Sequence, residues 1–192
     1  MKLLEQKIVE SGRILDGNVL KVDNFLNHQI DTSLMKEIGK EIARLFKDDH
    51  VTKVLTIEAS GIAIAIAAAM EMNVPMVFAK KSQTKNLSGD IYSTPVYSYT
   101  HATTYDVRVC KNYLSCDDRV LIIDDFLANG AAFMGLVDLV KQAGATLCGG
   151  AIAIEKAFQD GGKTIREKGI KLCSLAKIES MDTKSGITFS QD

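Results

Sequence analysis

Two adjacent carboxylates end an apolar run in the stretch VLIIDDFLANGAA, residues 120–132. Branched aliphatic residues come before Asp124 and Asp125, and such a run predicts a buried strand that carries both acids near its carboxyl end. The residues that open the next predicted helix are small or amidic: Ala128, Asn129, Gly130, Ala131 and Ala132. In an open parallel sheet, this is the edge at which ligands bind.

This stretch combines two kinds of binding group. Backbone amides at the start of a helix hold an anion with the help of the helix dipole, whereas carboxylates accept hydrogen bonds from hydroxyl groups. A ribose 5-phosphate offers both partners, so the pattern favours a sugar phosphate as the ligand. The plain alternative is that Asp124 and Asp125 only begin a turn and cap the helix, as aspartate often does.

A second candidate anion site lies earlier in the chain. Ala59 and Ser60 stand where one predicted strand ends and the next helix begins, so their amides and the Ser60 hydroxyl are able to meet an anion. The alternative is an ordinary turn in which Ser60 caps the helix. Lys81 ends the following predicted strand, where its ammonium group would neutralise a diphosphate as a point charge. A solvated lysine at a sheet edge is the alternative there.

The elements that must position these residues alternate between apolar strands and helices. The predicted strands cover residues 53–60, 74–81, 119–126, 146–156 and 171–180, and the predicted helices cover 31–46, 61–72, 131–144 and 161–169. That alternation is typical of an α/β fold with a mainly parallel central sheet flanked by helices. At 192 residues, the chain is expected to form a single domain.

Two segments depart from this rhythm. Residues 1–30 contain a turn at Asp16–Asn18 followed by alternating apolar residues, and we expect them to form a small flap or hood over the core of residues 31–192. Residues 82–105 are polar, rich in Ser, Thr and Tyr, and too long for a routine connection. They are expected to form a flexible lid loop or an excursion from the sheet.

Composition excludes several classes of protein. The 23 basic and 24 acidic residues give no general attraction to nucleic acid or to an anionic membrane. The four cysteines lack metal-ligand spacing, so no protein-held metal is expected and the thiols are taken as reduced. The most apolar stretch is shorter than a membrane span, and the N-terminus is unlike a signal peptide. We therefore expect a cytoplasmic protein.

Four stretches in this order resemble the type I phosphoribosyltransferase family. VLIIDDFLANGAA resembles its signature for 5-phospho-α-D-ribose 1-diphosphate (PRPP), IEASGIAIAIAAA its pyrophosphate loop, VFAKKSQTKNLSGD its basic strand end and lid, and IAIEKAF the strand that brings a lysine to the nucleobase. The combination is far more specific than any one piece and covers most of the chain. Together with NVLKVDNFLNHQID, it is most similar to the bacterial branch that uses xanthine.

The resemblance implies transfer of ribose phosphate from PRPP to xanthine, with diphosphate released, Mg²⁺ bound through PRPP, and a homodimer. It implies catalytic roles for Asp124, Asp125 and Lys81. The residues that it implies for PRPP binding are 128–132, Ala59 and Ser60, and those for base binding are Leu20, Asn27 and Lys156. Catalysis would come mainly from charge stabilisation and alignment, without a covalent nucleophile.

The chain departs from the family at the phosphate turn. Where many members have Thr-Gly-Gly-Thr, it has Asn129 to Ala132, so two hydroxyl donors are missing, and we expect the Asn129 amide to replace one. An acid found in hypoxanthine-guanine members is Ala128 here, which leaves no obvious general base. Two alternatives stay open: a preference for hypoxanthine or guanine, and a non-catalytic PRPP-sensing regulator. The regulator is disfavoured because residues 1–30 lack a clear helix-turn-helix and a basic excess.

Overall fold

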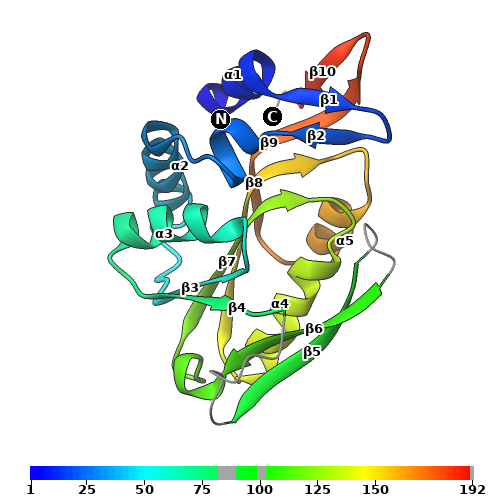
Figure 1. Ribbon diagram of the computed structural model, residues 1–192. Coiled ribbons are helices and arrows are strands. Elements are labelled where there is room, and N and C mark those ends of the chain that lie inside the picture. Colours follow the sequence, from blue (N-terminus) through cyan, green and yellow to red (C-terminus); the bar gives the residue numbers. More distant parts are fainter. Residues whose placement is uncertain (82–89, 99–102, 191–192) are drawn as a thin grey trace.

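The computed structural model describes residues 1–81, 90–98 and 103–190. Its centre is a sheet in the order β10-β9-β8-β7-β3-β4 (Figure 1). The strands are β3 (Lys53–Ile57), β4 (Met76–Ala79), β7 (Arg119–Leu127), β8 (Thr146–Lys156), β9 (Leu172–Asp182) and β10 (Gly186–Phe189). All neighbours pair in parallel except β9 and β10, which pair antiparallel. The expected fold class, a mainly parallel sheet flanked by helices, is confirmed.

Helices cover both faces of this sheet. They are α2 (Thr32–Leu45), α3 (Gly61–Met72), α4 (Ala131–Gln142) and α5 (Gly161–Glu167). Strand side chains alternate between two cores: Leu121 and Ile123 belong to the core with α2 and α3, and Ile122 belongs to the core with α4. The predicted helix start near residue 31 is confirmed, because the Asp31 carboxylate accepts a hydrogen bond from the Leu34 amide at 3.1 Å.

The hood contains more regular structure than the sequence predicts. It consists of α1 (Lys2–Ser11), a hairpin of β1 (Arg13–Leu15) and β2 (Val19–Lys21), and a π-helical turn, Asp23–Asn27. The turn expected at Asp16–Asn18 connects the two strands. Leu4 and Ile8 of α1 are buried in the core that contains α2. This packing explains why a helix forms in a segment that was expected only to be a small flap or hood.

The segment expected as a lid loop or an excursion from the sheet is, for much of its length, a regular hairpin. Ile91–Ser98 form β5 and Thr103–Cys110 form β6, which pair antiparallel and lie beside α4 (Figure 1). Val96, Val107 and Val109 are buried in the core with α4. The hairpin therefore packs on the protein through an apolar face, although the segment is polar in overall composition. A flexible loop over the whole of 82–105 is therefore wrong. Residues 82–89 and 99–102 lie outside the described residues, and the lid there stays a prediction.

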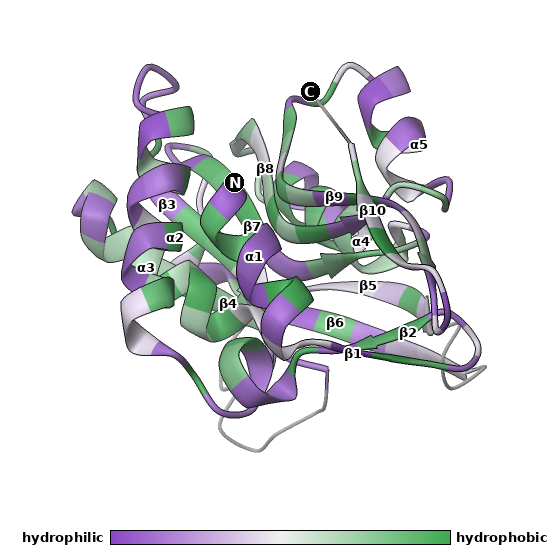
Figure 2. Cartoon of the chain, turned by 90° about the horizontal axis from the view of Figure 1, so that it is seen from above, coloured by the Kyte–Doolittle hydropathy of each residue, from purple (hydrophilic) through white to green (hydrophobic). Residues whose placement is uncertain are grey.

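Hydrophobic residues lie along the strands between the helices, whereas α1 and α2 carry long hydrophilic stretches (Figure 2). Among the described residues, no helix combines the length and the apolar character needed to cross a membrane.

Candidate active site

Asp124 and Asp125 lie within β7, near its carboxyl end. Both are buried, with 7% of each residue exposed. Adjacent residues of a strand point to opposite faces, but the two carboxyl groups remain close enough to interact, since, in addition to burial, the charge and the side chain of Asp125 both raise the pKa of Asp124. Asp124 lines a cavity beside β6 and α4, and Asp125 accepts a hydrogen bond from the hood residue Asn27 at 2.9 Å.

The Asp124 carboxyl is the most strongly perturbed acid at this edge. Burial, and then the nearby charge of Asp125, hold the pKa of Asp124 well above its usual value. The Asp125 amide, which donates to Asp124 Oδ1 at 3.0 Å, and the charge of Lys81 act in the opposite direction. A buried carboxylate of this kind is satisfied by hydrogen-bond donors brought to it. Ligand hydroxyl groups are donors of that type.

The turn after β7 forms a concave surface. It lines a cavity of about 170 Å³. The other lining residues are Tyr97, Tyr105, Asp124, Phe126, Leu127 and Phe133. Gly130 has a φ of 84°, a left-handed conformation that glycine adopts without strain. Asn129 Oδ1 accepts a hydrogen bond from the Ala131 amide at 3.0 Å. The Asn129 side chain, which was expected to donate to a phosphate in place of a missing hydroxyl, therefore also stabilises the turn.

The start of α3 faces the same carboxylate. Ser60 stands at the N-cap position of α3, as the alternative expected, but it has helical backbone angles and its hydroxyl makes no capping hydrogen bond. A Cβ on Gly61 would lie 2.2 Å from Thr56 Oγ1 and 3.0 Å from Asp124 Oδ1. Only glycine therefore allows α3 to begin this close to β7. Ala59 precedes Ser60 in the same turn.

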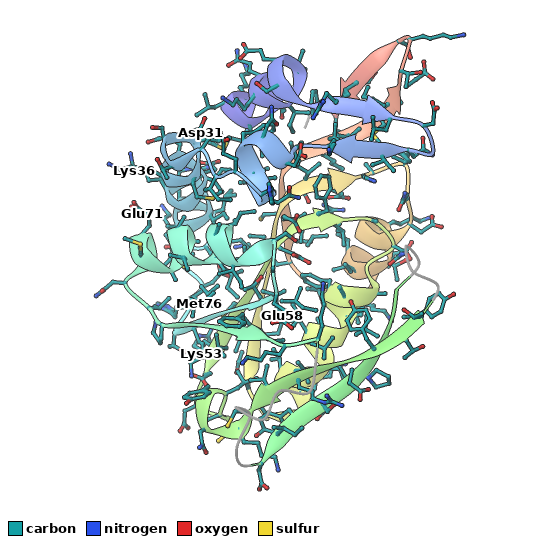
Figure 3. All side chains as sticks on the ribbon, viewed as in Figure 1. Asp31, Lys36, Lys53, Glu58, Glu71 and Met76 are labelled. Carbon is teal, nitrogen blue, oxygen red and sulfur yellow. The ribbon has the colours of Figure 1, made fainter. Side chains whose placement is uncertain are left out.

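Lys81 follows β4 and has neighbours on β6 and at the ends of β3 and β7. Its backbone amide donates to Glu58 Oε1 at 2.6 Å, which connects the chain beyond β4 to the residue after β3; Figure 3 labels Glu58 at this edge. The Lys81 ammonium lies 5.7 Å from the centre of the Tyr105 ring. Its charge also lowers the pKa of Asp124, which places it within electrostatic reach of that carboxyl.

The three predicted base-binding residues all contact or belong to the hood. Asn27 donates to Asp125, and Lys156 Nζ donates to the carbonyl oxygen of Asn18 at 2.9 Å. Leu20 is buried in the core that the hood shares with α2 and the sheet, with 6% of its surface exposed. Burial lowers the pKa of Lys156. The structure thus places Asn27 and Lys156 at the hood's contacts with the sheet edge, and the binding of a base by the three residues stays a prediction.

Two aromatic residues of the site were missed by sequence reasoning. The Phe126 ring lies 5.8 Å from Lys156 Nζ and lines the cavity beside the phosphate turn. Tyr105 lines that cavity from β6, and burial, followed by the charge of Asp124, raises its pKa. Phe126 follows the two acids directly, and this position in the sequence could have identified it as a site residue. Tyr105 lies in the segment expected to be a loop, where nothing indicates its direction.

Solved structures with this fold define the class of protein. An adenine phosphoribosyltransferase from Rhodothermus marinus superimposes with a TM-score of 0.76 at 19% identity, covering 92% of this chain and 99% of that chain. An adenine phosphoribosyltransferase from Trypanosoma brucei, in complex with AMP, pyrophosphate and ribose-5-phosphate, gives 0.75 at 21% identity, covering 91% and 79%. The fold is therefore that of the phosphoribosyltransferases.

Sequence relatives narrow the class. A xanthine phosphoribosyltransferase of Bacillus cereus is 53% identical over 191 residues, which are 100% of this chain and 96% of that protein. One from Lachnoclostridium phytofermentans is 56% identical over 186 residues, 97% and 96% of the two chains. No model of a protein family matches the sequence. At this identity over the full length, the chain belongs to the xanthine phosphoribosyltransferase family.

Proposed function

We propose that this protein is a purine-salvage enzyme that converts xanthine and PRPP to xanthosine 5′-monophosphate (XMP) and diphosphate. The observation that carries the proposal is the edge of β7, where two buried carboxylates precede a turn that lines a cavity. The relatives named xanthine phosphoribosyltransferase, which match over the whole chain, support it. A comparison of diphosphate release with single bases distinguishes this function from the alternative, an enzyme that prefers hypoxanthine or guanine.

Different residues at this edge bind different parts of PRPP. Asp124 and Asp125 accept hydrogen bonds from the ribose hydroxyls, and the amides of residues 128–132 hold the 5-phosphate. Ala59, Ser60 and Lys81 face the diphosphate. During transfer the bond from ribose C1 to the diphosphate oxygen breaks and a bond from C1 to a purine nitrogen forms. Positive charge develops at C1 in between, so the nearby carboxylates stabilise the transition state.

Base recognition is assigned to the hood and to the end of β8. Lys156 donates a hydrogen bond to the 6-oxo group of the purine or favours the anionic form of an acidic purine such as xanthine, and its ammonium group lies near the Phe126 ring. The Asn27 amide donates to the 2-oxo group, which hypoxanthine lacks. A site built around such a donor discriminates against a base without the matching acceptor, because the donor is then left unpaired. Leu20 supplies apolar contact.

Magnesium fits this site as a companion of PRPP. No group of three or more His, Cys, Asp or Glu residues lies close enough to hold a metal ion among the residues that the structure describes. Asp124 and Asp125 offer hard oxygen ligands, the type Mg²⁺ prefers, and the ion usually keeps several waters and binds through substrate phosphates. When bound, it would neutralise charge on the departing diphosphate.

The proposal includes a cytoplasmic homodimer. An apolar surface on α2 and α3 supports the second copy as partner: it includes Met35, Ile66 and Met70, and Lys36 and Glu71 lie at its rim (Figure 3). Met70 is 76% exposed and Ile66 is 42% exposed. Across a two-fold axis, this surface of one copy would meet the same surface of the other, as self-complementary interfaces require. We refer to this set as the α2–α3 surface.

The decisive experiment offers single bases to the purified protein with Mg²⁺ and PRPP. We expect diphosphate release with xanthine to exceed release with guanine, hypoxanthine or adenine. Faster release with hypoxanthine or guanine would reassign the base, and no release with any base would contradict the proposal and favour a PRPP sensor. Asp125→Asn is the matched variant, because it keeps the side-chain size and removes one charge. It should weaken PRPP use while circular dichroism shows an intact fold.

A further inference from the structure

The back of the phosphate turn rests on the first residues of α5. The Gly161 amide donates to the Ala128 carbonyl oxygen at 3.2 Å. A Cβ on Gly161 would lie 2.3 Å from that oxygen and 2.7 Å from both Asn129 C and Gly130 N. These neighbours are backbone atoms of the turn itself and cannot yield as a flexible side chain does. Any shift of α5 is therefore transmitted directly to residues 128–130.

An ion pair between a buried glutamate and a partly exposed arginine fixes α5 in that place. Glu155 of β8 is only 2% exposed. Arg166 of α5 donates to both of its oxygens, Nη1 to Oε1 at 2.8 Å and Nη2 to Oε2 at 2.7 Å, and the Ser174 hydroxyl of β9 also donates to Oε2. Two parallel hydrogen bonds fix the direction of the arginine as well as its distance. The pair therefore orients the helix relative to the sheet.

The second residue of α5 makes room for this pair. A Cβ on Gly162 would lie 1.9 Å from Glu155 Oε1 and 2.7 Å from Arg166 Nη1. The lack of a Cβ thus matters for a different reason at each glycine. At Gly161 it allows the turn to approach α5, and at Gly162 it leaves space for the Glu155–Arg166 ion pair. Glycine is a poor helix former compared with alanine, so helix propensity does not explain this pair of residues. The two close approaches do.

We propose that Glu155, Arg166, Gly161 and Gly162 are positioning residues for PRPP, which hold the phosphate turn at its working distance from β7. The inference rests on the proposed function, in which this turn holds the 5-phosphate. None of the four lines the cavity that the turn faces, so they act through residues 128–130. A displaced turn loses hydrogen bonds to the phosphate, and this loss weakens PRPP binding without changing the base contacts.

The test measures steady-state kinetics with PRPP and xanthine varied separately. Gly161→Ala should raise KM for PRPP about tenfold, the factor expected when one hydrogen bond to a charged group is lost. KM for xanthine and kcat should change little. Gly162→Ala and Arg166→Lys, which keep both charges but disturb the paired hydrogen bonds, should shift KM for PRPP in the same direction. Lys163→Ala is the control, because its side chain is 75% exposed on the same helix.

Several outcomes would overturn the inference. One is an unchanged KM for PRPP in Gly161→Ala relative to Lys163→Ala; another is a proportional fall of all rates that follows the folded fraction. Should Gly161→Ala fail to fold, Ser174→Ala removes a single hydrogen bond and must still raise KM for PRPP. If the wild type transfers to no base, the proposed function fails separately. Ribose 5-phosphate binding by calorimetry, compared between wild type and the variants, then tests the positioning role alone.

Discussion

At the scale of single residues, Asp124 shows how the site opposes the stability of the fold. Its pKa in the folded chain is raised by burial and by Asp125 above the ordinary value of about 3.9. Folding therefore favours the protonated form. The stability that this acid contributes is complete below about pH 4 and is lost as the pH rises through the folded-state pKa.

We predict that Asp124→Asn increases the free energy of unfolding at neutral pH, because it removes a buried charge that has no ion-pair partner among the residues that the structure describes. Urea unfolding at about pH 8 and about pH 4 checks the sign, since the gain should shrink at the acidic pH. The same variant should lose PRPP-dependent transfer. A variant that is less stable than the wild type at both pH values would contradict this account of the carboxyl.

At the scale of elements, the hood contacts the edge that we propose binds the sugar. Its π-helical turn brings the Asn27 amide to Asp125, and the β1–β2 turn brings a carbonyl to Lys156. A hydroxyl group that binds Asp125 meets a carboxylate already engaged by the hood. The conformation of residues 1–30 and the occupancy of the ribose site are therefore expected to influence each other.

We predict that Asn27→Ala lowers the ratio of kcat/KM for xanthine over that for hypoxanthine by about tenfold or more, because a polar match is lost. Asn24→Ala is the control. Asn24 belongs to the same turn, but its amide donates to the Ser11 carbonyl at 3.0 Å, away from the acids. Equal base preference in the two variants would remove Asn27 from base recognition.

The sequence predicts the elements best where one periodicity is sustained. The run before Asp124 and the amphipathic pattern after Asp31 place their strand and helix within a few residues, since burial enforces both. The sequence does not predict β5 and β6, because the valines that pack on α4 are separated by polar residues and form no continuous apolar run. The pairing of Asn27 with Asp125 is beyond sequence reasoning altogether, because it depends on how the hood folds back over the sheet.

At the scale of the whole molecule, the α2–α3 surface is where we expect a second copy to dock. α3 is almost entirely apolar along its length, and monomers rarely leave a large continuous apolar patch uncovered. The charged rim of Lys36 and Glu71 would set the register of the two copies.

We predict that Met70→Lys shifts the protein from dimer to monomer in sedimentation velocity. Stability of the separated chain should change by no more than about 0.5 kcal/mol, as for other surface substitutions. Val9→Lys is the control, because Val9 is 64% exposed on α1, outside that surface. A wild type that sediments as a monomer, or a Met70→Lys variant that stays dimeric, would contradict this assignment.

The construction of the hood has a consequence for how new base preferences arise. Its inward residues, such as Leu4, Ile8 and Phe25, share the main apolar core, whereas its contacts with the sheet edge include the single polar groups of Asn18 and Asn27. Exchanging residues 1–30 between related enzymes, with those inward positions kept, should move part of the selectivity for one nucleobase, and should leave the sugar chemistry intact only where the transplanted segment keeps the Asn27 contact with Asp125.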